Sequence, residues 1–222
     1  MPRNRTLAPP PRAEPQGYQG PSGVSRAGWP ETAGADAPPA GDAAAIRRAA
    51  WFAALPSCFT FTVDVEEYFH VSAFERWISP AEWGRYDSRV VHSVMRLLEI
   101  LAEQEVRGTF FVLGWVAQRH PSLVRELAVN GHEIASHGWD HRRVTHQTPA
   151  EFRDSVRRTR LYLEDLTGQP VRGFRAPSFS IVPGREWALD ILIEEGYLYD
   201  SSLFPIQRRG YGYATGQRDP HW

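Results

Sequence analysis

The stretch Cys58-Phe-Thr-Phe-Thr-Val-Asp-Val65 marks an abrupt change in the character of the chain. It is short, rich in β-branched and aromatic residues, and followed directly by acidic residues, a pattern typical of a buried β-strand. A chain of 222 residues is long enough for one sizeable domain and a tail. This strand therefore predicts an ordered domain over residues 57–222.

Residues 1–56, which precede this strand, are expected to be disordered. The branched aliphatic residues of the first fifty positions are Leu7, Val24 and Ile46 alone, and prolines alternate with Gly and Ala. Such a composition cannot bury enough apolar surface to offset the entropy lost on ordering. The segment also lacks the apolar region of a secretory signal, and Cys58 is the only cysteine, so we expect a cytoplasmic protein without disulfides.

The charge balance and hydropathy argue against two classes of protein. Lys and Arg total 25 against 26 Asp and Glu, so no positive excess attracts nucleic acid. No apolar run approaches the ~18 residues that a membrane-spanning helix needs. We expect no nucleic-acid partner and no transmembrane segment, and the oligomeric state stays open.

Strands and helices are predicted to alternate along the rest of the chain. Strands are expected at 58–65, 108–114, 132–137, 171–176 and 197–200, with helices at 88–105, 121–131, 148–168 and 185–195. Repeated βα units favour an α/β fold with a mostly parallel sheet, either doubly wound or curled towards a barrel. A complete eightfold barrel needs ~250 residues. About five βα units would therefore form an incomplete barrel.

Charged and metal-binding side chains gather where the predicted strands end. The loops at the carboxyl ends of parallel strands all emerge on one face of the sheet. The strand starts carry few such side chains, and this asymmetry favours a functional site. The candidates are Asp64, Glu66, Glu67, His137, His141, Arg175 and Asp200.

His137 and His141 are the strongest indication of a metal site. A spacing of four residues on a helical turn places both imidazoles within reach of one cation. A carboxylate from Asp64, Glu66 or Glu67 would complete a set that leaves one position for water. Asp64 and Glu66 alternate along an extended chain, so both would point the same way. The alternative is that Glu66 and Glu67 begin a helix and cap it.

Three further residues each have two possible roles. Arg175 could hold the Asp64 carboxylate with both arms of its guanidinium, or form a plain salt bridge. Asp200 could orient a catalytic imidazole or cap a turn with the serines that follow it. Trp139 could line a sugar-binding surface or simply pack. Five other histidines are expected to be surface or packing residues: His70, His92, His120, His132 and His146.

With these residues in view, the chain resembles the polysaccharide deacetylase family, the NodB-type domain of the carbohydrate esterases, from about residue 59 to about residue 206. The segments that carry the resemblance are Thr62-Val-Asp-Val-Glu66, Ser136-His-Gly-Trp-Asp-His141, Phe174-Arg-Ala-Pro177 and Tyr199-Asp-Ser-Ser202. Stretches such as Asp-Val-Glu-Glu-Tyr-Phe resemble the subgroup linked to exopolysaccharide biosynthesis and protein-sorting loci. The family fold is an irregular (β/α)7 barrel, so the resemblance implies an incomplete barrel of that type.

The resemblance also implies a hydrolase that removes N-acetyl groups from an N-acetylated polysaccharide or its precursor. A divalent cation, usually zinc, would be held by Glu66, His137 and His141, with Glu67 left open as a substitute for Glu66. Asp64 would act as the general base towards a metal-activated water. Arg175 would tune that base, and Asp200 would orient a histidine acid.

Two alternatives follow from a departure from the family pattern. The late Leu-x-His motif that supplies the acid does not occur before Trp222, and His221 lies in Asp-Pro-His-Trp, which does not match it. The chain is therefore expected to lack the C-terminal part of the domain. A catalytically incomplete carbohydrate-binding protein is one alternative function, and a cyclic-amide hydrolase on the same scaffold is the other.

Overall fold

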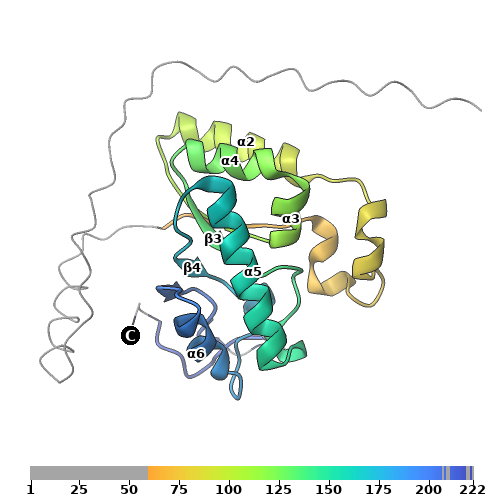
Figure 1. The fold of residues 1–222 in the computed structure, drawn as a ribbon, viewed down its shortest axis with the longest axis vertical. Coiled ribbons are helices and arrows are strands. Elements are labelled where there is room, and N and C mark those ends of the chain that lie inside the picture. The colour runs from red at the N-terminus through yellow and green to blue at the C-terminus, as the bar shows by residue number, and fades with distance from the viewer. Residues whose placement is uncertain (1–59, 207, 209–210, 219–220, 222) are drawn as a thin grey trace, which may run out of the picture. The chain divides into compact units, whose positions relative to one another are not determined.

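The computed structural model of the protein describes residues 60–206, 208, 211–218 and 221. These residues form an α/β domain around a parallel sheet of five strands in the order β1-β2-β3-β4-β5 (Figure 1). The predicted disordered segment 1–56 lies outside the described residues, as does the start of the first predicted strand. The predicted α/β class is confirmed, and within the described part of the chain the sheet does not close into a barrel.

The predicted strands are present in the predicted order, but each is shorter than expected. They are β1 (Thr62–Val65), β2 (Thr109–Val112), β3 (Glu133–Ser136), β4 (Gly173–Phe174) and β5 (Tyr199–Asp200). In the register, Asp64 of β1 lies beside Phe111 of β2, and Phe174 of β4 lies between Ser136 and Asp200. The strands stop early because the residues beyond them turn into the loops that carry the polar side chains.

Helices follow the strands as predicted, with one addition. They are α2 (Val90–Glu103), α3 (Gly114–Arg119), α4 (Pro121–Val129), α5 (Pro149–Thr167) and α6 (Trp187–Glu194). Gly114 was predicted to end the strand at 108–114, whereas it begins the additional helix α3. A Cβ atom at Gly114 would lie 2.3 Å from Trp139 Cε3, so only glycine lets this turn approach the indole.

Short 3-10 segments occupy the loops on the carboxyl side of the strands. Three of them lie between β1 and α2, namely η1 (Tyr68–His70), η2 (Ser72–Phe74) and η3 (Pro80–Arg85). The others are η4 (Val144–His146) after β3 and η5 (Pro177–Phe179) after β4. The loops after β1, β3 and β4 therefore hold irregular backbone where the candidate site residues lie.

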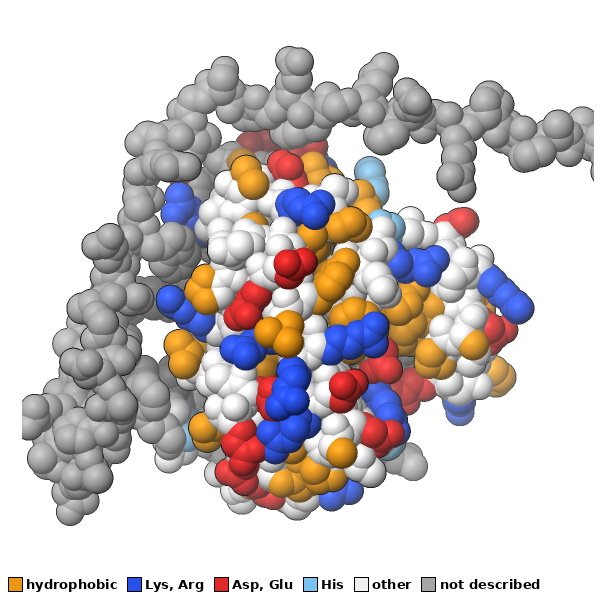
Figure 2. All heavy atoms as spheres, viewed as in Figure 1, with side chains coloured by type: hydrophobic (Ala, Val, Ile, Leu, Met, Phe, Trp, Pro, Cys, Tyr) orange, Lys and Arg blue, Asp and Glu red, His pale blue; other side chains and the backbone are white. Residues whose placement is uncertain are grey.

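The core is built between the sheet and the helices that cover it. All four residues of β2 are buried, as expected for a parallel strand covered on both faces. α4 and α5 lie side by side over the sheet (Figure 1). On their outer side, Figure 2 shows Arg and acidic side chains gathered over α5 and α6, where Arg157 Nε and Nη2 donate to Glu195 at 2.8 and 2.7 Å. No helix of the described residues has the length and apolar character needed to cross a bilayer.

Candidate metal centre

Asp64 and Arg175 meet at the carboxyl end of the sheet. Arg175 Nη1 donates to Asp64 Oδ1 at 2.8 Å, and Nη2 donates to Thr62 Oγ1 at 3.0 Å and to Ser201 Oγ at 2.9 Å. The guanidinium carbon also lies 4.1 Å from the centre of the Phe111 ring. Only one arm of Arg175 therefore binds Asp64, as in the plain salt bridge that was one of its two possible roles, because the second arm joins the hydroxyl groups of β1 and the β5 loop.

Glu66, His137 and His141 form a compact group of possible metal ligands. One ligand atom from each of these residues lies within 4.8 Å of the others. Among the described residues, this is the one group of three or more His, Cys, Asp or Glu side chains placed closely enough to hold a metal ion. His141 Nε2 lies 2.8 Å from Glu66 Oε2, and His137 Nε2 lies 4.0 Å from Asp64 Oδ2. The free oxygen of Asp64 therefore faces the group from the side opposite Arg175.

The tautomer of His137 follows from its contacts. Its Nδ1 lies 2.8 Å from the carbonyl oxygen of Arg175, which can only accept, so Nδ1 carries the proton. Nε2 is then unprotonated, and its lone pair is available to a metal ion held with Glu66 and His141. The imidazole is fully buried, and this burial lowers the pKa of His137 despite the nearby Asp64 carboxylate, which raises it. His137 is thus held as a neutral ring with a free ligand atom.

The residues present fit a divalent cation. Two imidazoles and one carboxylate are a typical donor set for zinc. Glu66 Oε2 is buried and has no hydrogen-bond partner in the described part of the chain, although His141 Nε2 is close to it. A close contact without hydrogen-bond geometry between two ligand-type atoms is expected where both face a common cation. The bond from His137 Nδ1 to the Arg175 carbonyl is the outer support that metal-binding histidines usually have.

The local backbone differs from the helical turn expected for this histidine pair. Residues 137–141 form an irregular loop after β3, in which Gly138 has a φ of +79° and His141 a φ of +54°. The left-handed conformation turns the chain back so that both rings face the same side, with their centres 5.4 Å apart. The expected convergence of the imidazoles is present, but the expected helix is wrong.

Glu67, the other acidic candidate after β1, points away from this group. Its carboxylate accepts hydrogen bonds from Ser88 Oγ and from the backbone N–H of Arg89, the latter at 3.0 Å. Arg89 is the residue that precedes α2, so Glu67 caps the start of that helix. Glu67 thus caps a helix, although it is α2 and not a solvated helix that begins at the two glutamates, and Glu66 lies beside the histidines.

Asp200 forms a turn at the end of β5. Its Oδ2 accepts from the backbone N–H of Ser202 at 2.9 Å and its Oδ1 from Ser202 Oγ at 2.5 Å. Partial burial raises the pKa of Asp200 to about 6, and the hydrogen bonds from Ser202 oppose that rise. None of the hydrogen bonds found in residues 60–206 joins Asp200 to an imidazole. Its role in orienting a histidine acid stays a prediction.

His70 packs beside the ligand group, in one of the two roles expected for it, but its closeness to His141 was not predicted. It was expected at the surface or in simple packing, yet its ring lies buried beside His141, with the ring centres 6.5 Å apart and the planes 20° from parallel. Burial, followed by the neighbouring His141 and His137, lowers the pKa of His70 to about 3. The available signal was its position four residues after Glu66, on the same loop.

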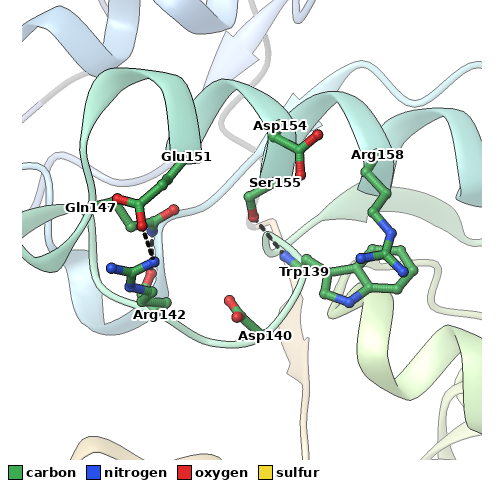
Figure 3. A pocket seen from close by; sticks show the side chains of 8 residues that line it. All are labelled: Trp139, Asp140, Arg142, Gln147, Glu151, Asp154, Ser155 and Arg158. Atoms are coloured by element: carbon green, nitrogen blue, oxygen red, sulfur yellow. Dashed lines mark hydrogen bonds and ion pairs between the residues drawn. The ribbon is translucent and has the colours of Figure 1, made fainter.

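Trp139 has a packing role, which was one of its two predicted roles. The Arg158 guanidinium carbon lies 3.4 Å above the indole, and Tyr162 meets the indole edge to face with centres 5.9 Å apart. Its backbone N–H donates to Ser155 Oγ at 3.0 Å. Figure 3 shows this tryptophan lining a polar pocket between the loop and α5, where Arg158 covers one face of the indole.

Part of the chain matches a known protein family. Residues 85–183 match the polysaccharide deacetylase family, a range that includes His137, His141 and Arg175 and excludes Asp64 and Glu66. Over this range the chain is similar to polysaccharide deacetylases. The crystal structure of a Mycobacterium smegmatis protein described as a polysaccharide deacetylase is 33% identical to this domain, with a TM-score of 0.56, over 68% of this chain and 55% of that one.

Two curated proteins that are similar to part of this chain are named for their substrates. The peptidoglycan-N-acetylglucosamine deacetylase PgdA of Listeria monocytogenes is 30% identical over 103 residues, which are 42% of this chain and 22% of that protein. The chitooligosaccharide deacetylase of a Bradyrhizobium strain is 32% identical over 97 residues, 43% of this chain and 42% of that protein. The chain thus spans less than half the length of these relatives.

Proposed function

We propose that this protein is a metal-dependent deacetylase that removes N-acetyl groups from a glycan built from N-acetylated sugars. The observation that carries the proposal is the meeting of Glu66, His137 and His141 beside the free oxygen of Asp64. The names of the two relatives, one acting on peptidoglycan N-acetylglucosamine and the other on chitooligosaccharide, support the substrate class.

Glu66, His137 and His141 would hold the cation, for which we propose zinc. A bound zinc ion would polarise a water molecule and the acetyl oxygen. Asp64 then takes the proton from the attacking water at Oδ2, because Oδ1 is already bonded to Arg175. Arg175 fixes the direction of this carboxylate through its hydrogen bond to Oδ1.

The proposed reaction also needs a proton for the departing amine. Asp200 lies on the β5 side of the same sheet edge, next to Ser201, which accepts from Arg175. We propose that Asp200 supports the group that delivers this proton, in keeping with the role that the family resemblance implies. The chemistry then yields acetate and a free amino sugar.

Acetate release from N-acetylglucosamine oligomers tests the proposal on the full chain. We expect release that a chelator abolishes and added zinc restores. D64N should abolish release while zinc affinity remains, because Asp64 is placed as the base and not in the ligand group. E66Q should lose zinc affinity and activity together. D140N, which removes a carboxylate from the same loop but faces the polar pocket of Figure 3, is the matched control.

Three results would count against the proposal in different ways. Full activity in a chelated, metal-free preparation contradicts the metal dependence. Oligosaccharide binding with no acetate from the zinc-loaded chain selects the carbohydrate-binding alternative. Turnover of a cyclic amide, with none of the oligosaccharide, selects the other hydrolase.

A further inference from the structure

We propose that His70 is a positioning residue of this metal centre, which orients the imidazole of His141. The inference rests on the proposed function, because it takes Glu66, His137 and His141 to hold a cation. His70 belongs to η1, four residues after Glu66, and its ring lies nearly parallel to that of His141. Its Nδ1 closes the capping box of η1, but the second ring nitrogen, Nε2, has no structural use in the described part of the chain.

Aromatic rings surround His70 on the sides away from His141. The ring centres of Trp83, Trp115 and Phe69 lie 4.3, 4.8 and 4.8 Å from that of His70. Such a cage fixes the plane of the imidazole, so His70 forms a rigid wall beside the His141 ring. An apolar residue of similar size would fill the same cage, and the choice of a polar ring needs another reason.

The hydrogen bonds of His70 fix its tautomer. The backbone N–H of Glu67 donates to His70 Nδ1 at 3.1 Å, so Nδ1 is an acceptor and the neutral ring carries its proton on Nε2. That Nε2–H is buried, and residues 60–206 offer it no hydrogen-bond acceptor. A buried donor without an acceptor destabilises the fold, and native proteins rarely retain one without a use for it.

The neighbouring His141 has the complementary feature. A metal-binding histidine usually donates its second ring N–H to an outer partner, as His137 does to the Arg175 carbonyl. For His141 the second nitrogen, Nδ1, is buried and has no such partner in the described part of the chain. The two ring centres lie 6.5 Å apart, and in this proposal one water accepts from both N–H groups and so fixes the direction of His141 Nε2.

Two substitutions separate this positioning role from a structural one. Asparagine at position 70 keeps an acceptor near the place of Nδ1 for the Glu67 N–H and removes the Nε2 donor, whereas glutamine supplies a donor near the place of Nε2. We expect H70N to weaken zinc binding by about 10–100-fold, the effect typical of outer-shell partners. H70Q should restore most of the affinity. Zinc affinity is measured on the full chain by competition with a chromophoric chelator, and urea unfolding of the metal-free forms reports stability.

His132 offers a matched control. It is also buried, and its Nδ1 accepts from the backbone N–H of Gly108 at 3.1 Å, but it lies at the opposite end of β3 from His137. H132N should leave zinc affinity unchanged. Equal loss of affinity in H132N and H70N, or in H70N and H70Q with a matching loss of metal-free stability, would make His70 a structural residue and overturn the proposal.

The zinc affinities of the wild-type chain and of H70N show whether the role of His70 or the whole metal centre is wrong. If the wild-type chain binds zinc and H70N binds it equally well, the positioning role is overturned and the metal centre remains. If the wild-type chain binds no zinc, both are overturned. If H70N and H70Q both fail to fold, His70 serves folding, and the positioning role is again overturned.

Discussion

Asp200 is expected to make stability depend on pH in an unusual direction, which the variant D200N should reveal. Partial burial raises the pKa of Asp200 from 3.8 to about 6. A carboxyl whose pKa is higher in the folded protein than in the unfolded chain favours folding when protonated. Its contribution is fully present below the unfolded-state pKa and is lost as the pH rises through about 6.

The size of this effect follows from the two pKa values. A rise from 3.8 to about 6 corresponds to about 3 kcal/mol, and because Asp200 is only half-buried we take about 2 kcal/mol. Asparagine does not ionise, but it keeps only one acceptor oxygen for the two hydrogen bonds from Ser202, which costs about 1 kcal/mol at every pH. D200N should therefore be less stable than wild type by about 1 kcal/mol near pH 3 and more stable by about 1 kcal/mol near pH 7.5.

Urea unfolding of both proteins at several pH values, with a chelator present throughout, measures this change. D190N removes an exposed carboxylate from α6 and controls for the loss of one negative charge. The reasoning is refuted if the stability difference between D200N and wild type stays constant with pH, or if D200N loses relative stability as the pH rises. Confirmation would mean that the protein keeps an ionised carboxylate at the site edge at a cost in stability.

Other substitutions test the framework around the site. S202A removes a buried hydroxyl that accepts from the Ala176 N–H at 2.7 Å and donates to Asp200, and should lower the free energy of unfolding in urea by about 1–3 kcal/mol. G114A forces a methyl group into the Trp139 ring and should cost about 1–3 kcal/mol, whereas G84A meets only a flexible arginine and should cost little. E195Q should lower the melting temperature at neutral pH. That difference should shrink as the pH falls below about 4.5, because hydrogen bonds from Arg157 lower the pKa of Glu195; equal losses at both pH values would contradict this.

The order of the fold could be predicted from the sequence because each element carries its own signal. The capping box at Thr148 and Glu151 and the left-handed Gly168 bound α5 as the sequence indicates. The two-residue strand β4 could not be predicted over 171–176, since strand length depends on where neighbouring strands still offer partners. The helix α3 was missed because its glycine is explained only by Trp139, which lies 25 positions later.

The candidate site could be predicted as far as the topology of a parallel sheet dictates it. Asp64 and Glu66 lie at the end of β1, whereas His137 follows β3 and Arg175 follows β4. These residues converge because parallel strands end at one edge. What the sequence could not predict is the detail set by tertiary contacts. The single-armed bond of Arg175 depends on Thr62 and Ser201, and the burial of His70 depends on tryptophans far along the chain.

Backbone strain gives independent support to the location of the site. Among the described residues, four non-glycine residues have a φ in the left-handed region, and three of them, His141, Ser178 and Phe179, lie in the loops after β3 and β4. Each costs of order 1–3 kcal/mol and persists only where the surroundings enforce it. Ser178 Oγ is held by Ser72 Oγ at 2.6 Å, and Ser72 Oγ also accepts from Arg143 Nε at 2.9 Å. The hydroxyl pair thus ties together the loops after β1, β3 and β4, so the strain that turns His141 towards Glu66 is maintained by contacts among the same loops that supply the proposed ligands.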